Sequence, residues 1–410
     1  MKIKRIFCGA LAVGMLLGQT SSVLAEAVSS PTPTPNPHTE YYAQAADTDS
    51  IEGWPTGPQI EAQSAVLMDL NSEAILYSKN ADTQLYPASI TKLLTCLLGC
   101  ENLDTSAQIT LSQQAAYGIE AGSSTIYGDA GEVFTVEQAL MGLMLESANE
   151  MALAIGEEVS GSVKKFVELM NARAQQLGCT NTHFNNPNGL PDETHVTTAN
   201  DMAKIAKAAW QNATCRKFFT TDLYEIPPTN VFTETRYLLN HHKMMAGRDY
   251  AYDGVLGGKT GYTDEALNTL VSCATDDNLE LISVVLKTHG KNVYPDSINL
   301  LEYGFNNFAK YTIADYEDSA DFKEIDPNAY VVLPENVNFQ SLDYEITQDK
   351  TNSSTGTVTY TYQGNPVGKA AVTLSDEYLQ KDNTENEAQV SGDKSDSETQ
   401  KQVQSTIPRE

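Results

Sequence analysis

Short, mostly hydrophobic stretches lie at both ends of the central part of this chain. Ala65–Asp69 and Ala74–Tyr77 have this pattern on either side of a polar turn, which predicts two strands. Leu267–Cys273 and Leu279–Lys287 are predicted as a second hairpin on the same grounds. Ordered structure is expected to begin near Ile60.

The long segment between these strands has helical spacing instead. Four helical stretches are predicted: one just after Ser89, one over 136–177 that is interrupted around Ser147, one through Trp210 that opens with a capping box of Thr198 and Asp201, and one over 297–308. Strands at both ends of a helical middle indicate an α+β domain over residues 58–312.

The residue pattern and composition change on both sides of this domain. Residues 313–378 contain short alternating stretches such as Thr357–Tyr362, which indicate a small all-β domain. Residues 379–410 are polar and repetitive, so they are predicted to form a disordered tail. Residues 26–57 contain a proline at every second position from Pro31 to Pro37, which is typical of an extended linker.

The first 25 residues have the pattern of a cleaved export signal. A basic start is followed by an apolar run from Ile6 to Gly18 that is too short to span a bilayer, and small residues lead up to Ala25. No other segment is apolar enough to cross a membrane, so no integral membrane span is expected after cleavage. The mature protein is therefore predicted to be exported and to work outside the cytoplasm, secreted or associated with the cell wall.

Composition narrows the choice of partners. The chain has 410 residues, of which 41 % are hydrophobic, so most of it can bury a core and a wholly disordered protein is excluded. It carries 54 acidic and 26 basic residues, a formal net charge of −28. Such a chain repels phosphate backbones, and nucleic acid is not expected as a partner.

Cysteine usage gives no sign of a framework of disulfides. Five cysteines remain beyond the signal, scattered through apolar stretches: Cys96, Cys100, Cys179, Cys215 and Cys273. An odd number of cysteines cannot pair completely within one chain. They are therefore predicted to be free buried thiols. No HExxH motif occurs, and neither a metal nor a cofactor is expected.

Three short motifs carry candidate chemistry. Ser89-Ile90-Thr91-Lys92 places a serine and a lysine on one helical face, at a helix N-terminus whose amide groups would stabilise a developing oxyanion. Ser147-Ala148-Asn149 interrupts an apolar helical region, where a buried hydroxyl and amide need partners. Lys259-Thr260-Gly261 offers a cation and a hydroxyl to an anion, and its glycine permits close approach to a strand edge.

Each motif alone has a plainer explanation. Two further Ser-x-x-Lys matches, at 162–165 and 391–394, are interpreted as accidental. Ser89 alone could simply cap a helix, Ser147 could be a turn residue and Lys259 could be solvated. The order and spacing of the three motifs together make the coincidence improbable.

The stretch from Ala65 to Phe308 resembles the serine-type D-Ala-D-Ala carboxypeptidases, the low-molecular-mass penicillin-binding proteins. The supporting motifs are the segments 87–92, 184–190, 198–202 and 258–263. The resemblance implies a β-lactamase/transpeptidase-like catalytic domain, and the β-rich segment 313–378 resembles the C-terminal domain of that family. It also implies peptidoglycan stem peptides as substrates and β-lactam antibiotics as inhibitors, with no cofactor.

Residue roles follow from the same resemblance. Ser89 would form an acyl-enzyme and release the last D-alanine, Lys92 would take the serine proton and Ser147 would relay a proton to the leaving amine. Asn149 would hold a substrate amide. The terminal carboxylate would meet Lys259 and Thr260 beside Gly261, and the oxyanion would meet the amide groups of Ser89 and Tyr262. Lowering the pKa of Lys92 from about 10.4 to near 7 costs about 4–5 kcal/mol, to which burial and the charge of Lys259 would contribute.

Three alternatives stay open at this point. A D,D-endopeptidase that cuts cross-links needs the same three motifs. A β-lactamase of class A uses a Ser-Asp-Asn motif and a separate glutamate, whereas position 148 is alanine. A non-catalytic wall-binding protein would have no need of an intact Ser89. Further cationic positions for substrate capture are Lys259 and Arg236, while His241 and His242 are expected to pack at a strand edge.

Overall fold

The computed structural model describes residues 39–380. The predicted signal, residues 26–38 of the predicted linker and residues 381–410 of the predicted tail lie outside this part of the chain. Within residues 39–380, no helix is both long and apolar enough to span a bilayer.

A five-stranded antiparallel sheet in the order β2-β1-β9-β8-β7 forms the centre of the predicted α+β domain. Its strands are β1 (Ser64–Asp69), β2 (Ile75–Lys79), β7 (Val255–Thr263), β8 (Leu267–Thr275) and β9 (Glu280–Thr288). Both predicted hairpins are confirmed. The sequence did not indicate that β1 pairs with β9, which joins the two hairpins into one sheet.

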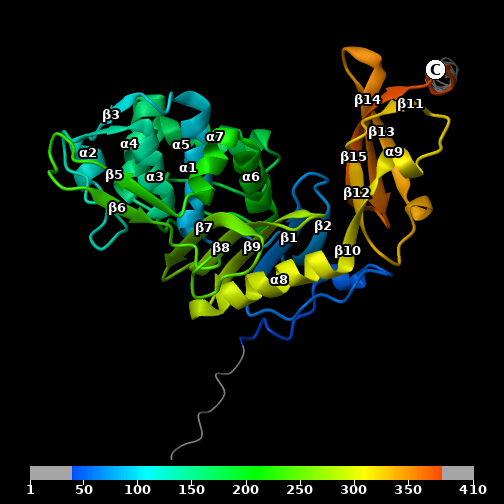
Figure 1. Ribbon diagram of the computed structural model, residues 1–410, viewed down its shortest axis with the longest axis horizontal. Coiled ribbons are helices and arrows are strands. Elements are labelled where there is room, and N and C mark those ends of the chain that lie inside the picture. The colour runs from blue at the N-terminus through cyan, green and yellow to red at the C-terminus, as the bar shows by residue number, and fades with distance from the viewer. Residues whose placement is uncertain (1–38, 381–410) are drawn as a thin grey trace, which may run out of the picture. The chain divides into compact units, whose positions relative to one another are not determined.

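Helices cover both faces of this sheet (Figure 1). Helix α8 (Val293–Asn307) packs on strands β1, β8 and β9, and α6 (Ala199–Gln211) contacts β1 and β9. Helix α7 (Ala213–Thr220) contacts β7. The other helices of this region are α1 (Lys92–Asn102), α2 (Gln113–Tyr117), α3 (Val136–Leu145), α4 (Asn149–Ser160) and α5 (Val163–Gln176). Short turns of 3₁₀ helix are η1 (Asp47–Ser50), η2 (Ala88–Thr91), η3 (Gly290–Asn292) and η4 (Phe339–Ser341).

The predicted interruption around Ser147 is confirmed, because α3 ends at Leu145 and α4 begins at Asn149. The predicted capping box at Thr198 is only half formed. Thr198 Oγ1 accepts a hydrogen bond from the Asp201 amide, but the Asp201 carboxylate accepts from the Asn181 amide instead of reaching back to Thr198. This hydrogen bond ties the start of α6 to the loop that follows α5.

Two small hairpins border the helical region. Strand β3 (Gln108–Thr110) pairs with β4 (Val133–Thr135), and β5 (Leu223–Ile226) pairs with β6 (Arg236–Leu239).

A second, six-stranded sheet follows in the order β10-β12-β15-β14-β13, with β11 paired to β15. Its elements are β10 (Phe308–Thr312), β11 (Phe322–Ile325), β12 (Tyr330–Pro334), β13 (Asp343–Asp349), β14 (Asn352–Tyr362) and β15 (Asn365–Leu374), with the short helix α9 (Ile313–Tyr316) after β10. The all-β region is confirmed as such. It starts with β10 at Phe308 rather than at residue 313, because α8 runs directly into that strand.

Ordered structure begins well before Ile60, and the sequence interpretation of residues up to 57 as linker is wrong for their second half. Trp54 is buried, donates a hydrogen bond to the Leu76 carbonyl and packs against Phe308 with 5.2 Å between ring centroids. The Lys79 ammonium group donates to the Tyr41 carbonyl. These residues close one hydrophobic cluster that extends from the first sheet into the second. A single tryptophan among polar residues gave too weak a pattern to predict this packing.

Candidate active site

Ser89 lies in the 3₁₀ turn η2, directly before α1 begins at Lys92. The turn starts with Ala88 at φ +51°, a left-handed conformation that costs a non-glycine residue about 1–2 kcal/mol. Thr269 Oγ1 on β8 holds the turn by donating to the Pro87 carbonyl over 2.9 Å. Such strain at a fixed position before a serine is typical of a functional site.

The Lys92 amine is surrounded by three oxygen atoms. Its Nζ lies 3.0 Å from Ser89 Oγ, 2.7 Å from Asn149 Oδ1 and 2.6 Å from the Asn188 carbonyl oxygen. The amide and carbonyl oxygens only accept hydrogen bonds, so a neutral amine directs its two N–H groups to them. Its lone pair then faces the Ser89 hydroxyl, which is the geometry of a general base.

The electrostatic surroundings favour this neutral amine. Lys92 is fully buried, and burial holds its pKa well below the ordinary value for lysine. The charge of Lys259 lowers the pKa of Lys92 further, while Glu150 opposes both effects. The lowered pKa favours the neutral form of Lys92, which is the form that can accept a proton from a serine.

Ser147 and Asn149 lie where α3 gives way to α4. Ser147 adopts φ +59°, and its hydroxyl is buried without a hydrogen-bond partner. An unsatisfied buried hydroxyl costs about 1–3 kcal/mol, so its retention points to a partner that arrives with a ligand. Asn149 instead already has a partner, because its Oδ1 accepts from Lys92.

Strand β7 forms the opposite wall and carries the third motif. A cavity of about 730 Å³ lies between this strand and the serine motifs, and the predicted site residues among its lining are Ser89, Ser147, Asn149, Thr260, Gly261 and Tyr262. Lys92 and Lys259 lie buried beneath this lining. The structure thus assembles all three motifs around one cavity.

Gly261 explains how β7 can pass so close to the serine. A methyl group at this position would lie 2.9 Å from the Ser89 amide nitrogen, tighter than real carbon contacts. The absence of a side chain therefore keeps the amide of Ser89 beside the strand that presents the amide of Tyr262.

Lys259 is 2 % exposed, and burial lowers its pKa to about 7 while Glu146 opposes the shift. Its Nζ donates to the Thr260 carbonyl over 2.9 Å. An amine with this pKa is divided between its charged and neutral forms near neutral pH, and a bound anion would favour the charged form.

The segment 184–195 supplies site residues to which the sequence analysis gave no role. Asn188 contributes the carbonyl oxygen that accepts from Lys92, and Thr95 Oγ1 donates to the neighbouring Pro187 carbonyl over 2.6 Å. His195 fastens the segment to η2: its Nδ1 accepts from the Asn185 amide, so its Nε2 carries the proton donated to Thr91 Oγ1. Burial lowers the pKa of His195 to about 4, which keeps this tautomer neutral. The motif 184–190 was the available signal, but its function depends on backbone atoms that a sequence does not display.

Arg236 is not a residue for substrate capture, contrary to the sequence interpretation. Its guanidinium forms a buried ion pair with Glu132, at 2.7 and 3.0 Å, and lies over the Phe232 ring. The charge of Arg236 is therefore paired with Glu132 inside the protein.

The expectation of packing at a strand edge is confirmed for His242, which lies beside Gly258 of the edge strand β7, and is wrong for His241. His241 lines the cavity and lies 3.0 Å from the Glu146 carboxylate. His242 is buried and hydrogen-bonded to Ser272 Oγ on β8. Burial lowers the pKa of His242 to about 4.

Comparison with known proteins agrees with this geometry. The model of the peptidase S11 family, described as D-alanyl-D-alanine carboxypeptidase, matches residues 52–290. The chain is 35 % identical over 259 residues to the D-alanyl-D-alanine carboxypeptidase DacF of Bacillus subtilis, covering 62 % of this chain and 64 % of that protein. It is 34 % identical to DacA of Haemophilus influenzae, with 62 % and 65 % covered. The chain therefore spans slightly less than two thirds of the length of these relatives.

Solved structures show the same fold. Penicillin binding protein 5 of Haemophilus influenzae superimposes with a TM-score of 0.64 at 27 % identity, covering 78 % of this chain and 98 % of that one. A mutant of a Streptomyces DD-transpeptidase superimposes with a TM-score of 0.58 at 30 % identity, covering 61 % of this chain and 99 % of the other. The first match extends through the second sheet, whereas the second is confined to a shorter part of the chain.

Proposed function

Because the chain belongs to the D-alanyl-D-alanine carboxypeptidase family S11, we propose that it removes the terminal D-alanine from peptidoglycan stem pentapeptides. The observation that carries this proposal is the position of Lys92, whose lone pair faces Ser89 while two carbonyl oxygens hold its N–H groups. The same serine would be acylated by penicillins. The export signal predicted from the sequence is consistent with an enzyme that works at the cell wall.

Acylation begins with proton transfer from the Ser89 hydroxyl to Lys92 as the oxygen attacks the carbonyl carbon between the two D-alanines. The negative charge that develops on the carbonyl oxygen is stabilised by the amide groups of Ser89 and Tyr262. These donors are already fixed in position, so no reorganisation is needed during the reaction. The C–N bond then breaks, and the Ser147 hydroxyl passes a proton from Lys92 to the leaving amine. Free D-alanine and an ester on Ser89 result.

Deacylation repeats these steps with water as the nucleophile. Lys92 takes a proton from the water, the Ser89 ester bond breaks and the proton returns to Ser89. Lys259 and Thr260 bind the carboxylate of the terminal D-alanine during acylation, and Asn149 contacts a substrate amide. The unsatisfied Ser147 hydroxyl supports its role, because the substrate amine supplies the partner that the free site lacks.

Mass spectrometry of the mature protein with a D-Ala-D-Ala pentapeptide tests the proposal. We expect loss of one alanine from the peptide and a transient covalent adduct on the peptide containing Ser89. The Ser89→Ala variant should form neither. Cleavage of a cross-linked stem-peptide dimer, with the pentapeptide left intact, would identify a D,D-endopeptidase instead. Rapid turnover of penicillin would identify a β-lactamase, and an unreacted protein would be a binding module.

The alkaline side of the pH profile should report on Lys259. Its pKa of about 7 means that the cation that binds the carboxylate is lost as pH rises through that value in the free enzyme. We therefore expect kcat/KM for the pentapeptide to fall above about pH 7, since kcat/KM reports on the free enzyme. In Lys259→Arg the guanidinium stays charged, so the decline should move to higher pH. An unchanged decline in that variant would assign it to another group.

A further inference from the structure

Two neighbouring cysteines and a third that lies more than 100 residues later in the chain meet inside the fold. Cys96 and Cys100 lie one turn apart on α1, and Cys215 lies in the first turn of α7. The three sulfur atoms lie within 4.8 Å of one another, and the sulfurs of Cys96 and Cys215 are 3.3 Å apart. None of the three is in a disulfide. The prediction of free thiols is confirmed, but the sequence did not indicate that three of them lie together.

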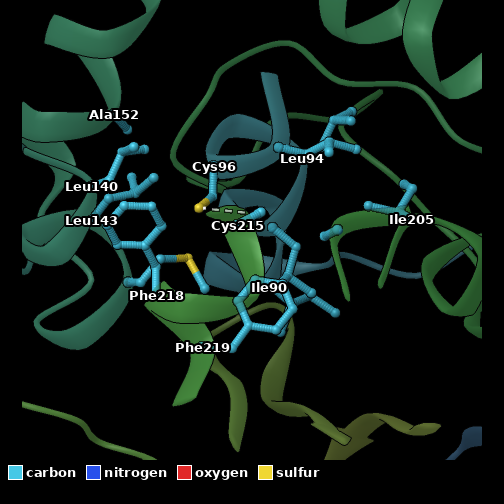
Figure 2. Close-up of a cluster of buried hydrophobic side chains, with 14 of the residues drawn as sticks. Ile90, Leu94, Cys96, Leu140, Leu143, Ala152, Ile205, Cys215, Phe218 and Phe219 are labelled. Atoms are coloured by element: carbon cyan, nitrogen blue, oxygen red, sulfur yellow. Dashed lines mark hydrogen bonds between the residues drawn. The ribbon is translucent and has the colours of Figure 1, made fainter. Parts of the chain in front are cut away.

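The surroundings of these three thiols are apolar. Figure 2 shows Cys96 and Cys215 among hydrophobic side chains that include Leu140, Leu143 and Phe218. Cys96 and Cys215 are fully buried, whereas Cys100 is only half-buried and gives the group a side open to solvent. Within residues 39–380, no histidine or carboxylate joins the group as a fourth closely spaced ligand.

We propose that Cys96, Cys100 and Cys215 form a binding site for a soft, three-coordinate ion, and that trivalent arsenic is the species that their number and setting fit best. Thiolates select soft ions over hard ones. Three thiolates around trivalent arsenic give a neutral complex, whereas a divalent ion leaves one negative charge and a monovalent ion leaves two. An uncompensated charge is costly in an apolar interior, so the neutral complex is preferred.

The binding reaction needs no oxidant or reductant. Arsenous acid condenses with three thiols: three As–O and three S–H bonds break, three As–S and three O–H bonds form, and three waters leave. Arsenic stays trivalent and no net proton is released.

An ion at this position would connect two elements that border the active site. Cys96 lies four residues after Lys92, on the same face of α1. Helix α7 in turn contacts β7, the strand that carries Lys259. Occupancy should therefore stabilise the packing of α1 against α7, independently of the serine chemistry.

The test is native mass spectrometry of the mature chain, reduced with a phosphine and incubated with sodium arsenite. We expect one arsenic atom per chain, with a mass gain of one arsenic less three hydrogens. We also expect a higher thermal midpoint, because the ion binds the native state. Binding should be lost in Cys96→Ser and Cys215→Ser and weakened in Cys100→Ser. Cys179→Ser and Cys273→Ser are matched controls, since both remove a buried thiol outside the group and should retain binding.

X-ray absorption at the arsenic edge of the wild-type complex tests the site without any variant. Three sulfur neighbours are expected, and two sulfurs with one oxygen would overturn the proposal. Failure of the reduced chain to bind arsenite would overturn it as well. An affinity for Zn²⁺ equal to that for arsenite would refute the argument for a neutral complex. A Cys96–Cys215 disulfide in the protein purified without reductant would show that the thiols serve as a covalent link instead.

Discussion

Replacing Lys92 with alanine is expected to lower the rate of acylation by penicillin and by the pentapeptide about 10²–10⁴-fold, the usual contribution of a general base. The physical reason is the loss of the lone pair that faces the Ser89 hydroxyl at 3.0 Å. The measurement is the rate of labelling with a fluorescent penicillin. Lys92→Arg should be similarly slow, because a guanidinium does not give up its proton near neutral pH.

The chain contains its own control for this substitution. Ser162 and Lys165 have the same spacing as Ser89 and Lys92, but Lys165 is exposed and Ser162 caps the start of α5. Lys165→Ala should therefore label at the wild-type rate. Circular dichroism should show that Lys92→Ala is folded, although the Asn149 and Asn188 oxygens lose their donor at about 1–3 kcal/mol each. Wild-type labelling of Lys92→Ala would exclude Lys92 as the base.

Replacing Gly189 with alanine is expected to lower acylation about 10²-fold or more and to reduce thermal stability. Gly189 has φ +89°, and a methyl group there would overlap the Ala88 carbonyl and lie 2.9 Å from the Ser89 amide nitrogen. Relief of the overlap requires the turn that carries Ser89 to move, and displacements of about 1 Å can cost 10²-fold in rate. The measurements are the labelling rate and the midpoint of thermal unfolding.

Gly178 separates the steric effect from the conformational one. It has a similar φ of +76°, but no atom lies within 4 Å of a methyl group built on it. Gly178→Ala should thus cost only about 1–2 kcal/mol of stability, for the left-handed backbone, and leave labelling unchanged. If both variants lose activity equally, the proposed overlap at the serine turn is not the cause.

Local patterns in the sequence were sufficient for much of the fold. The hairpins at 65–77 and 267–287 and the helix break at Ser147 follow from residue spacing, which depends on near neighbours. The three motifs at Ser89, Ser147 and Lys259 likewise predicted a site that the structure assembles around one cavity.

Contacts between distant residues account for what the sequence did not predict. The Asn188 carbonyl is a backbone atom and the overlap at Gly189 involves a turn 100 residues earlier, so neither leaves a local pattern. Arg236 was predicted to be available for substrate because the sequence does not show that it pairs with the distant, buried Glu132. The position of Trp54 and the meeting of Cys96 with Cys215 are further pairings that spacing alone does not encode.

The pairing of β1 with β9 has a consequence for how the chain folds. Ser64 is opposite Leu286, so β1 can pair with β2 at once, but its second neighbour, β9, exists only after more than 200 further residues of chain. Loop closure over such a distance slows folding, and unpaired strand edges invite aggregation in the meantime. In a chain whose N-terminal end appears first, Ser89 is present long before β9. Ser89 should therefore react with penicillin only when the sheet that includes β9 is nearly complete. The time at which covalent labelling first appears after synthesis would then measure when this sheet is completed.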